Sequence, residues 1–216
     1  HDVKAAIRYF KMNDELYNDY KVDTNRIYVG GVSAGAIAAV NAAYLDDISE
    51  IPSFLLDDYD VLGGFEGLSG NAGYDSSFNG VVNLCGAVGN DQWISEGNIP
   101  IVSMHGDQDT VVPYDDSLVT LFGLNIQVDG SYMIHQRMLE LGNDSNLHTY
   151  INQGHTPFSN MNFETEFTRS FLYDFVCTPD LILGDLNGDS NVDVTDIVLL
   201  INLILSGSYL EPGDIN

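Results

Sequence analysis

Basic residues are scarce in this sequence. It contains 7 Lys and Arg against 32 Asp and Glu, which gives a formal net charge of −25 at pH 7. Proteins that bind nucleic acid or anionic membranes use clustered Lys and Arg to meet phosphate, so this balance excludes both kinds of partner. The acidic excess favours solubility and attracts divalent cations. It fits calcium binding, a salty habitat or both.

Long hydrophobic runs are also missing. The longest apolar stretch, from Ile197 to Leu205, is interrupted by Asn202 and is shorter than the roughly 18 residues of a membrane span. The sequence therefore predicts no membrane span. The chain begins at His1 with neither an initiator Met nor a signal peptide, and we expect an upstream portion to be missing.

Cysteine is limited to Cys85 and Cys177. An even pair in an extracellular chain is typical of a disulfide. Two separate buried thiols fit the pattern equally well, because a sequence does not show the Cα separation that a bridge requires.

The order of predicted elements indicates an α/β fold. A chain of 216 residues, 44% hydrophobic, can bury a sizeable core. Apolar patterning predicts strands at 26–30, 80–85, 99–104 and 146–151, and helices at 2–13, 33–45, 131–141 and 163–175. Strands that alternate with helices predict a mostly parallel sheet flanked by helices, with ligands beyond the carboxyl ends of the strands. The glycine-rich region 46–77 is interpreted as an insertion near that edge.

A candidate nucleophile follows the first predicted strand. Residues 31–35 read Gly-Val-Ser-Ala-Gly, the G-x-S-x-G pattern of an elbow that holds its serine, here Ser33, in a strained conformation. The turn places the hydroxyl at a helix N-terminus, whose dipole favours developing negative charge. Small residues are expected on both sides because strand and helix approach closely there. A plain glycine-rich turn with an N-capping serine is the alternative.

A candidate acid follows the third predicted strand. Asp107 and Asp109 both lie there, and either carboxylate could orient a histidine by accepting its Nδ1 hydrogen. Acids that only cap a turn are the alternative. His105, in the same segment, is interpreted as a structural histidine that packs the loop.

A candidate base, His155, follows the fourth predicted strand. A base must move a proton between the nucleophile and the leaving group, and a loop histidine next to glycine has the necessary mobility. The other histidines suit this role less, because His1 is terminal, His135 lies on a predicted helix and His148 lies within a predicted strand. A surface histidine without function is the alternative.

From Asp2 to about Cys177 the chain resembles bacterial carboxylesterases of the α/β-hydrolase superfamily, near feruloyl or acetylxylan esterases and polyhydroxybutyrate depolymerases. The resemblance is carried by residues 2–10, 23–35, 105–113 and 154–155. In that superfamily the acid segment reads His-Gly, two variable residues, Asp, and closes with Val-Pro, which selects Asp109. The resulting order of Ser33, Asp109 and His155 is the order of α/β hydrolases and differs from that of chymotrypsin and subtilisin.

The resemblance implies ester hydrolysis through an acyl-enzyme, with no cofactor for catalysis. Ser33 would attack the carbonyl, His155 would take its proton, and Asp109 would hold the imidazole. One oxyanion donor would be the backbone N–H of Ala34. The second donor normally comes from a His-Gly-Gly-like loop near the start of the domain. No such segment is present and the early strands are missing with it, so we expect a fragment or processed product with a bare sheet edge. One missing oxyanion donor typically lowers kcat roughly 100- to 1000-fold.

Composition changes after Cys177, and we expect a domain boundary between residues 1–178 and 179–216. The second segment places oxygen side chains at loop positions 1, 3, 5, 7, 9 and 12, the alternation that calcium loops use. Ser190 stands where such loops have glycine. The segment resembles the first repeat of a dockerin type I module, followed by the start of a second at 213–216. The ligands that this resemblance implies are the side chains of Asp185, Asn187, Asp189 and Asp196 and the backbone carbonyl of Asn191, with Asp193 acting through water.

Several functions remain open at this stage. The leading hypothesis is a secreted serine esterase that acts on plant-polysaccharide side-chain esters or on polyesters. Its dockerin-like segment would bind calcium and either a cohesin partner or a cell-surface sorting system, whereas a solvated acidic linker is the alternative for that segment. A serine peptidase of the prolyl-oligopeptidase type shares the triad order, and an inactive hydrolase domain could serve as a scaffold. The substrate pocket is expected to draw on residues 46–77, the Trp93 loop and upstream residues.

Overall fold

The computed structural model describes residues 1–121, 124–177, 184, 186–187 and 191–206. By its internal contacts the chain divides into two compact units, residues 1–168 and 169–216. The predicted domain boundary at 178–179 lies outside the described residues. No described helix combines the length and the apolar character that crossing a membrane requires.

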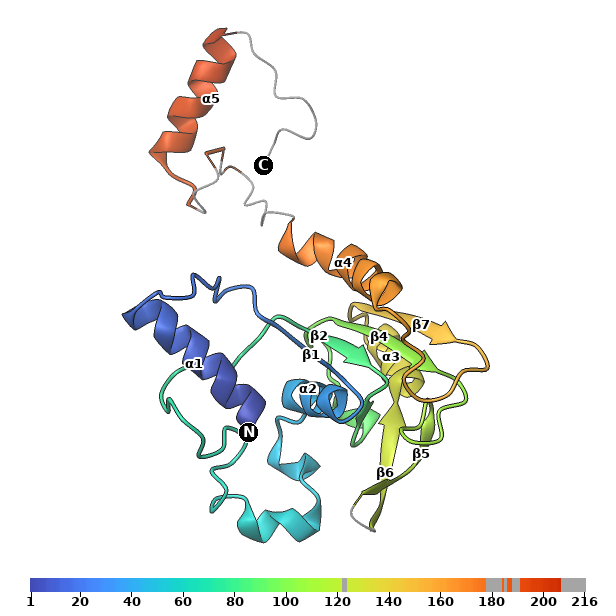
Figure 1. Ribbon diagram of the computed structural model, residues 1–216. Coiled ribbons are helices and arrows are strands. Elements are labelled where there is room, and N and C mark those ends of the chain that lie inside the picture. Colours follow the sequence, from blue (N-terminus) through green and yellow to red (C-terminus); the bar gives the residue numbers. More distant parts are fainter. Residues whose placement is uncertain (122–123, 178–183, 185, 188–190, 207–216) are drawn as a thin grey trace. The chain divides into compact units, whose positions relative to one another are not determined.

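The first unit is built on a parallel sheet of four strands in the order β1-β2-β4-β7 (Figure 1). These strands are β1 (Tyr28–Val32), β2 (Gly80–Leu84), β4 (Ile101–Gly106) and β7 (Ser145–Tyr150). They correspond to the four predicted strands, with β1 and β4 each lying two residues further along the chain. β1 is an edge strand of this sheet, and its Val32 side chain is exposed.

Three helices cover one face of the parallel sheet, namely α1 (Asp2–Leu16), α2 (Ala34–Tyr44) and α3 (Ser131–Glu140). They share one buried cluster with strands β2 and β4, because each helix turns an apolar stripe toward the sheet. Its members from these elements are Ile7, Ala39, Val40, Tyr44, Val81, Ile101, Ile134 and Met138.

The opposite face carries an aromatic cluster. His148 of β7 lies against Phe163 and Phe167, with ring centroids 4.5 and 5.7 Å apart. Both phenylalanines belong to α4 (Asn162–Val176), whose first two turns lie in the first unit. Helices on both faces agree with the α/β architecture that the sequence predicts.

A second sheet was not predicted. It is antiparallel in the order β3-β6-β5 and consists of β3 (Ala87–Val88), β5 (Asp116–Leu121) and β6 (Leu124–Gly130) (Figure 1). β5 and β6 form a hairpin directly before α3. At Gly130, where β6 meets α3, a Cβ atom would lie 2.1 Å from the carbonyl oxygen of Pro113, so only glycine fits this crossing.

The region between α2 and β2 contains the 3₁₀ helices η1 (Ile48–Glu50) and η2 (Ser53–Asp58), and η3 (Asp91–Trp93) follows β3. A buried arginine of α1, Arg8, ties this region down. Its guanidinium donates to the Glu66 carboxylate at 2.7 Å and to the carbonyl oxygens of Glu66, Ser69 and Gly70. Charge-assisted bonds of this kind to a buried arginine are among the stronger ones in proteins. They hold residues 66–70, which follow the two 3₁₀ helices, against α1.

Candidate active site

Ser33 occupies the corner between β1 and α2. It is the N-cap residue of α2 with φ 54° and ψ −118°, in a region that residues with a side chain rarely adopt. Its backbone N–H donates to the carbonyl oxygen of Leu84 at 2.8 Å, which fixes the corner to the neighbouring strand. The strained serine that the sequence predicts is therefore present.

Two glycines flank this corner, and they differ in the space around them. A Cβ atom on Gly31 would lie 2.4 Å from the carbonyl carbon of Gly35, so strand and helix do approach closely there. A Cβ atom on Gly35 would meet nothing within 4 Å. The expected need for small residues on both sides of Ser33 is thus met at Gly31 and is wrong for Gly35.

The three residues of the predicted triad form one chain of hydrogen bonds. His155 Nε2 lies 2.8 Å from Ser33 Oγ, and His155 Nδ1 lies 2.6 Å from Asp109 Oδ2. The ionised carboxylate only accepts, so Nδ1 carries the hydrogen and Nε2 accepts the serine proton. The Asp109 side chain is fully buried, and that of His155 is 19% exposed. The imidazole therefore lies between a buried charge and a half-buried hydroxyl.

Asp109 is held by donors on both of its oxygens. Oδ1 accepts the backbone N–H groups of Val111 at 2.8 Å and Val112 at 3.0 Å. Burial is the largest influence and raises the pKa of Asp109, but the hydrogen bonds from His155, Val111 and Val112 outweigh it and leave the pKa below its ordinary value. The carboxylate is therefore ionised where it faces the imidazole.

Asp107, the competing acid, has a different task. Its carboxylate accepts the backbone N–H of Asn152 at 2.6 Å, and its own N–H donates to the carbonyl oxygen of Tyr150. Asp107 thus orders the loop that carries His155. Gly106 lets the same loop approach, since a Cβ atom there would lie 2.4 Å from the carbonyl oxygen of Gln153.

His105 makes contacts that the sequence did not reveal. Its side chain is completely buried, and Nε2 lies 3.1 Å from Asp109 Oδ2. The interpretation of His105 as a packing residue accounts for its burial but not for this contact with the triad acid. The sequence shows that a histidine lies in a predicted buried strand. It does not show which way the ring points.

Cys85 lies at the end of β2, beside the triad. Its thiol, one Asp109 oxygen and one His155 nitrogen lie within 4.8 Å of one another, the donor types that zinc prefers. Both Asp109 oxygens already accept N–H groups, so the described hydrogen bonds satisfy this site without a metal. Burial raises the pKa of Cys85, which keeps the thiol neutral.

Cys85 and Cys177 are unbridged in the structure, Cys85 buried and Cys177 exposed. They belong to different units of the chain, so the disulfide that the even cysteine count allowed stays a prediction. The other alternative, two buried thiols, holds for Cys85 only.

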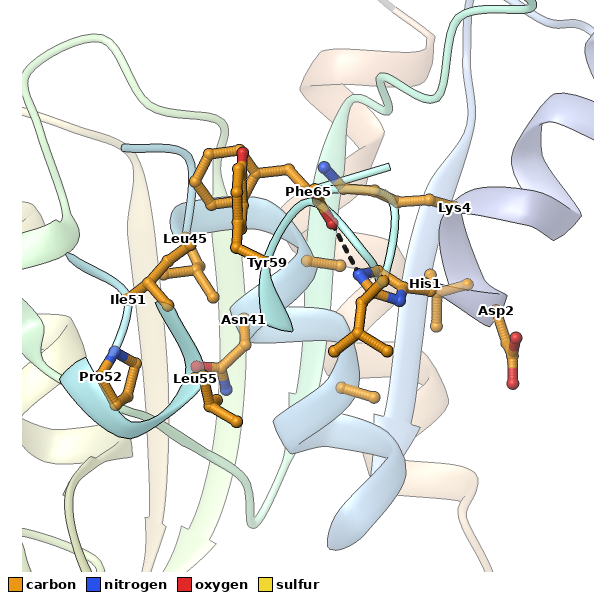
Figure 2. Close-up of a pocket in the computed structure, with 15 residues that line it drawn as sticks. His1, Asp2, Lys4, Asn41, Leu45, Ile51, Pro52, Leu55, Tyr59 and Phe65 are labelled. Carbon is orange, nitrogen blue, oxygen red and sulfur yellow. Dashed lines mark hydrogen bonds between the residues drawn. The ribbon is translucent and has the colours of Figure 1, made fainter. Parts of the chain in front are cut away.

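A cavity of about 470 Å³ lies between the start of α1, α2 and the loop that follows α2 (Figure 2). His1 closes one side, with Nε2 2.8 Å from the carbonyl oxygen of Gly64. The lining is mostly apolar and draws on the 46–77 region, but it includes neither the triad nor Trp93. The expected substrate pocket, which would combine these residues with the triad, stays a prediction. Trp93 instead packs against the main buried cluster. The apolar lining residues from the 46–77 region are Ile51, Pro52, Leu55, Tyr59, Leu62 and Phe65.

Part of the predicted calcium loop is described in the second unit. Asp196 is buried at the start of α5 (Val194–Ser206), where Oδ1 accepts the backbone N–H groups of Leu186 and Asn187, and Oδ2 accepts that of Asp193. These bonds, the one from Asp193 first, lower the pKa of Asp196. Asp193 Oδ1 in turn accepts the N–H of Thr195 at 2.7 Å and so caps α5. Asn191 is exposed, and the expected ligands Asp185 and Asp189 lie outside the described residues.

The comparisons with known proteins find similar solved structures and nothing else. No protein-family model and no curated protein matches the sequence. Among solved structures, the apo form of esterase 2 from Thermogutta terrifontis matches with a TM-score of 0.56 at 18% identity, over 81% of this chain and 64% of that one. The same esterase phosphorylated by paraoxon matches with a TM-score of 0.56 at 17% identity, over 81% of this chain and 62% of that one. A bifunctional GH43-CE protein of Bacteroides eggerthii matches with a TM-score of 0.58 at 18% identity, over 80% of this chain and 24% of that one.

The chain spans less than two thirds of the length of these structures. It has the fold of bacterial esterases, a mixed α/β fold consistent with the α/β-hydrolase architecture that the sequence predicts. Its Ser-His-Asp hydrogen-bonded chain lies at the carboxyl ends of the parallel strands. The shared fold and this hydrogen-bonded chain are the two observations from which a function can be proposed.

Proposed function

We propose that this protein is a serine carboxylic-ester hydrolase with Ser33 as nucleophile, His155 as general base and acid, and Asp109 as the residue that orients the imidazole. The observation that carries the proposal is the continuous chain from Ser33 Oγ through His155 to Asp109 Oδ2, with separations of 2.8 and 2.6 Å. Hydrogen bonds of this length lie within the range in which a positioned base abstracts a proton. The esterase fold supports the ester as substrate class.

The proposed reaction passes through an acyl-enzyme. Ser33 Oγ attacks the ester carbonyl while its proton moves to His155 Nε2, and the charged imidazolium is stabilised by Asp109. The backbone N–H of Ala34, at the N-terminus of α2, is the proposed oxyanion donor. His155 then gives the proton to the departing alcohol oxygen as the C–O bond breaks. Water, activated by the same imidazole, hydrolyses the acyl-serine and regenerates Ser33.

Labelling with a fluorophosphonate probe tests this proposal directly. The full chain is expected to be modified at Ser33, as located by mass spectrometry, and to hydrolyse p-nitrophenyl acetate. Ser33→Ala is expected to abolish labelling and to lower kcat by roughly 10⁴- to 10⁶-fold, because the nucleophile and base act as a unit. Wild-type protein that is folded by circular dichroism yet neither labelled nor active would contradict the esterase assignment and favour a scaffold role.

Plant-polysaccharide side-chain esters and polyesters are the substrates we propose. One similar solved structure is a bifunctional GH43-CE protein, and another is an esterase that paraoxon phosphorylates. A peptidase of the prolyl-oligopeptidase type is the competing candidate. Feruloylated and acetylated xylans compared with proline-containing peptides in one panel would separate the two.

We propose in addition that residues 179–216 form a calcium-binding attachment module in a secreted protein, with a cohesin domain or a cell-surface sorting system as its partner. The Asp196 carboxylate accepts the backbone N–H groups of Leu186, Asn187 and Asp193. Among the described residues its Oδ2 accepts only the N–H of Asp193, which leaves this oxygen a lone pair for a cation. Asn187, Asn191 and Asp193 supply further oxygen atoms in the same loop, and calcium prefers oxygen ligands. The exposed apolar side chains of α5 support a partner-binding role, and they include Ile197, Val198, Ile201, Ile204 and Leu205.

A further inference from the structure

A buried polar network lies directly behind the triad acid. His105 is completely buried in β4, and its Nε2 lies 3.1 Å from both Asp109 Oδ2 and the carbonyl oxygen of Val112. Both neighbours are acceptors, so Nε2 must carry a hydrogen that it donates. Asp109 Oδ2 therefore receives hydrogen bonds from two imidazoles, those of His155 and His105.

The other nitrogen of His105 continues the network. Nδ1 lies 2.8 Å from Ser131 Oγ, at the first residue of α3. Asn83 Nδ2 donates to Ser131 Oγ and to Ser103 Oγ, each at 3.0 Å, and Asn83 Oδ1 accepts the backbone N–H of Gly86. Ser131 Oγ accepts from Asn83, and its own hydrogen has two acceptors, His105 Nδ1 at 2.8 Å and the carbonyl oxygen of Gly86 at 3.4 Å. The shorter contact is the one to Nδ1, which agrees with the neutral tautomer that carries its hydrogen on Nε2.

This network is built from three elements of the core. Asn83, Ser103, His105 and Ser131 are all fully buried, on β2, β4 and α3. Buried polar groups destabilise a core unless they are bonded, and a connected set rigidifies what it holds. The end of the network that reaches the site is the Nε2–H of His105. The four buried side chains thus hold the His105 ring so that its Nε2–H stays directed at Asp109.

We propose that His105 is a positioning residue of the triad, which donates Nε2–H to Asp109 Oδ2 and so holds the carboxylate in the orientation that receives His155 Nδ1–H. Two backbone N–H groups fix Oδ1 and two imidazoles fix Oδ2, so that rotation of the carboxylate breaks at least one bond. The inference deepens the proposed ester hydrolysis, and its activity readout rests on that proposed function.

Removal of the His105 donor has a predictable electrostatic consequence. The titratable groups that face Asp109 and His105 in the described structure are His155, Cys85 and Tyr114, whose ring meets that of His105 edge-on at 5.7 Å. With that donor removed, the carboxylate can turn away from the Nδ1–H of His155, so that the charged imidazole loses part of the stabilisation that Asp109 gives it. The acid limb of the pH dependence of kcat/KM should therefore move to lower pH.

Asparagine and glutamine at position 105 separate the two hydrogen bonds of the imidazole. An asparagine amide can reach Ser131, as Nδ1 does, but is too short for Asp109, whereas a glutamine amide can reach Asp109 in place of Nε2. His105→Asn is expected to lower kcat by roughly 10- to 100-fold with KM unchanged, because misplacement of a catalytic group affects the chemical step. His105→Gln is expected to restore most of kcat and the wild-type pH profile.

His135 provides a matched control. Its Nδ1 lies 2.8 Å from Ser145 Oγ, the same distance as between His105 and Ser131, but no described carboxylate faces it. His135→Asn should change stability without moving the pH profile. If His105→Asn lowers the melting temperature as His135→Asn does and leaves kcat and the acid limb at wild-type values, His105 is a structural residue only and the proposal is overturned.

A proton NMR measurement decides the question without activity. The hydrogen on His155 Nδ1, bonded to a buried carboxylate, should give a low-field signal that shifts upfield in His105→Asn and returns in His105→Gln. An unchanged signal in the asparagine variant overturns the proposal. Wild-type protein that neither hydrolyses esters nor is labelled at Ser33 contradicts the proposed function instead, and the NMR comparison still settles the role of His105.

Discussion

At the scale of single residues, most of the candidate site could be predicted because each member has its own local pattern. Ser33 lies in a G-x-S-x-G turn, and His155 follows a strand beside glycine. The choice of Asp109 over Asp107 needed the family resemblance, since both acids lie at the same strand end. The contacts of His105 and Cys85 with the triad could not be predicted. They depend on which side chain of a strand faces which loop, and that is set by strand register between segments far apart in sequence.

Three histidines outside the triad make the stability of the fold sensitive to acid. Burial lowers the pKa of His105, His135 and His148 from the ordinary value of 6.5. Each stays neutral in the folded chain at a pH where the unfolded chain is protonated. Their contribution is therefore complete above pH 6.5 and is lost as the pH falls from there toward the lowered pKa values.

We predict that the free energy of unfolding is smaller at about pH 5 than at about pH 7.5. In His135→Gln this difference between the two pH values should be smaller than in the wild type. Urea unfolding followed by circular dichroism at the two pH values measures it. Carboxylates with lowered pKa values, such as Asp109, titrate below this window and do not contribute. An equal difference in wild type and variant would show that His135 is not one of the groups responsible.

At the scale of elements, the parallel strands and their helices could be predicted because apolar runs and helical periodicity are strong local signals. The β5–β6 hairpin was missed for a physical reason. Its strands lie partly at the surface, with Leu118 and Ile126 exposed, and therefore lack the continuous apolar run of the buried strands. It pairs with β3, an element of two residues that no periodicity can reveal.

The corner at Ser33 offers a prediction with a built-in control. Gly31→Ala places a methyl group 2.4 Å from the backbone of Gly35, so strand and helix must separate, at a cost of about 1–3 kcal/mol in stability. Gly35→Ala enters open space on a helix and is expected to be neutral or to stabilise by up to about 1 kcal/mol.

Chemical denaturation of the two glycine variants measures the difference, and fluorophosphonate labelling follows the nucleophile. Gly31→Ala should be labelled more slowly as well as being less stable. Equal losses of stability in both variants would mean that the close approach at Gly31 does not hold the corner together.

At the scale of the whole molecule, the chain consists of two compact units. The sequence indicated a change of character after Cys177, and the structure separates residues 169–216 as a unit of their own. The ligand positions at 185 and 189 lie outside the described residues, so the calcium loop stays a prediction from the spacing of its oxygen side chains.

Calcium binding to the full chain is the corresponding prediction. Isothermal titration with Ca²⁺ is expected to show one site, and Mg²⁺ at equal concentration should not replace it, because a flexible loop of many oxygen atoms suits the larger ion. Asp185→Ala should remove the site. Asp144→Ala, an acidic change of equal charge in the first unit, should leave it intact. If both variants still bind calcium as the wild type does, the binding comes from the overall negative charge of −25 and not from the predicted loop.

The arrangement of the four parallel strands has a consequence for the time course of refolding. Ser33 follows β1, Asp109 follows β4 and His155 follows β7, while β2 lies between β1 and β4. No pair of strands alone brings the three residues together, so a partly assembled sheet holds a serine without its partners. Recovery of probe labelling after dilution from denaturant should therefore lag behind the return of helical signal, and it would report the last strand to dock.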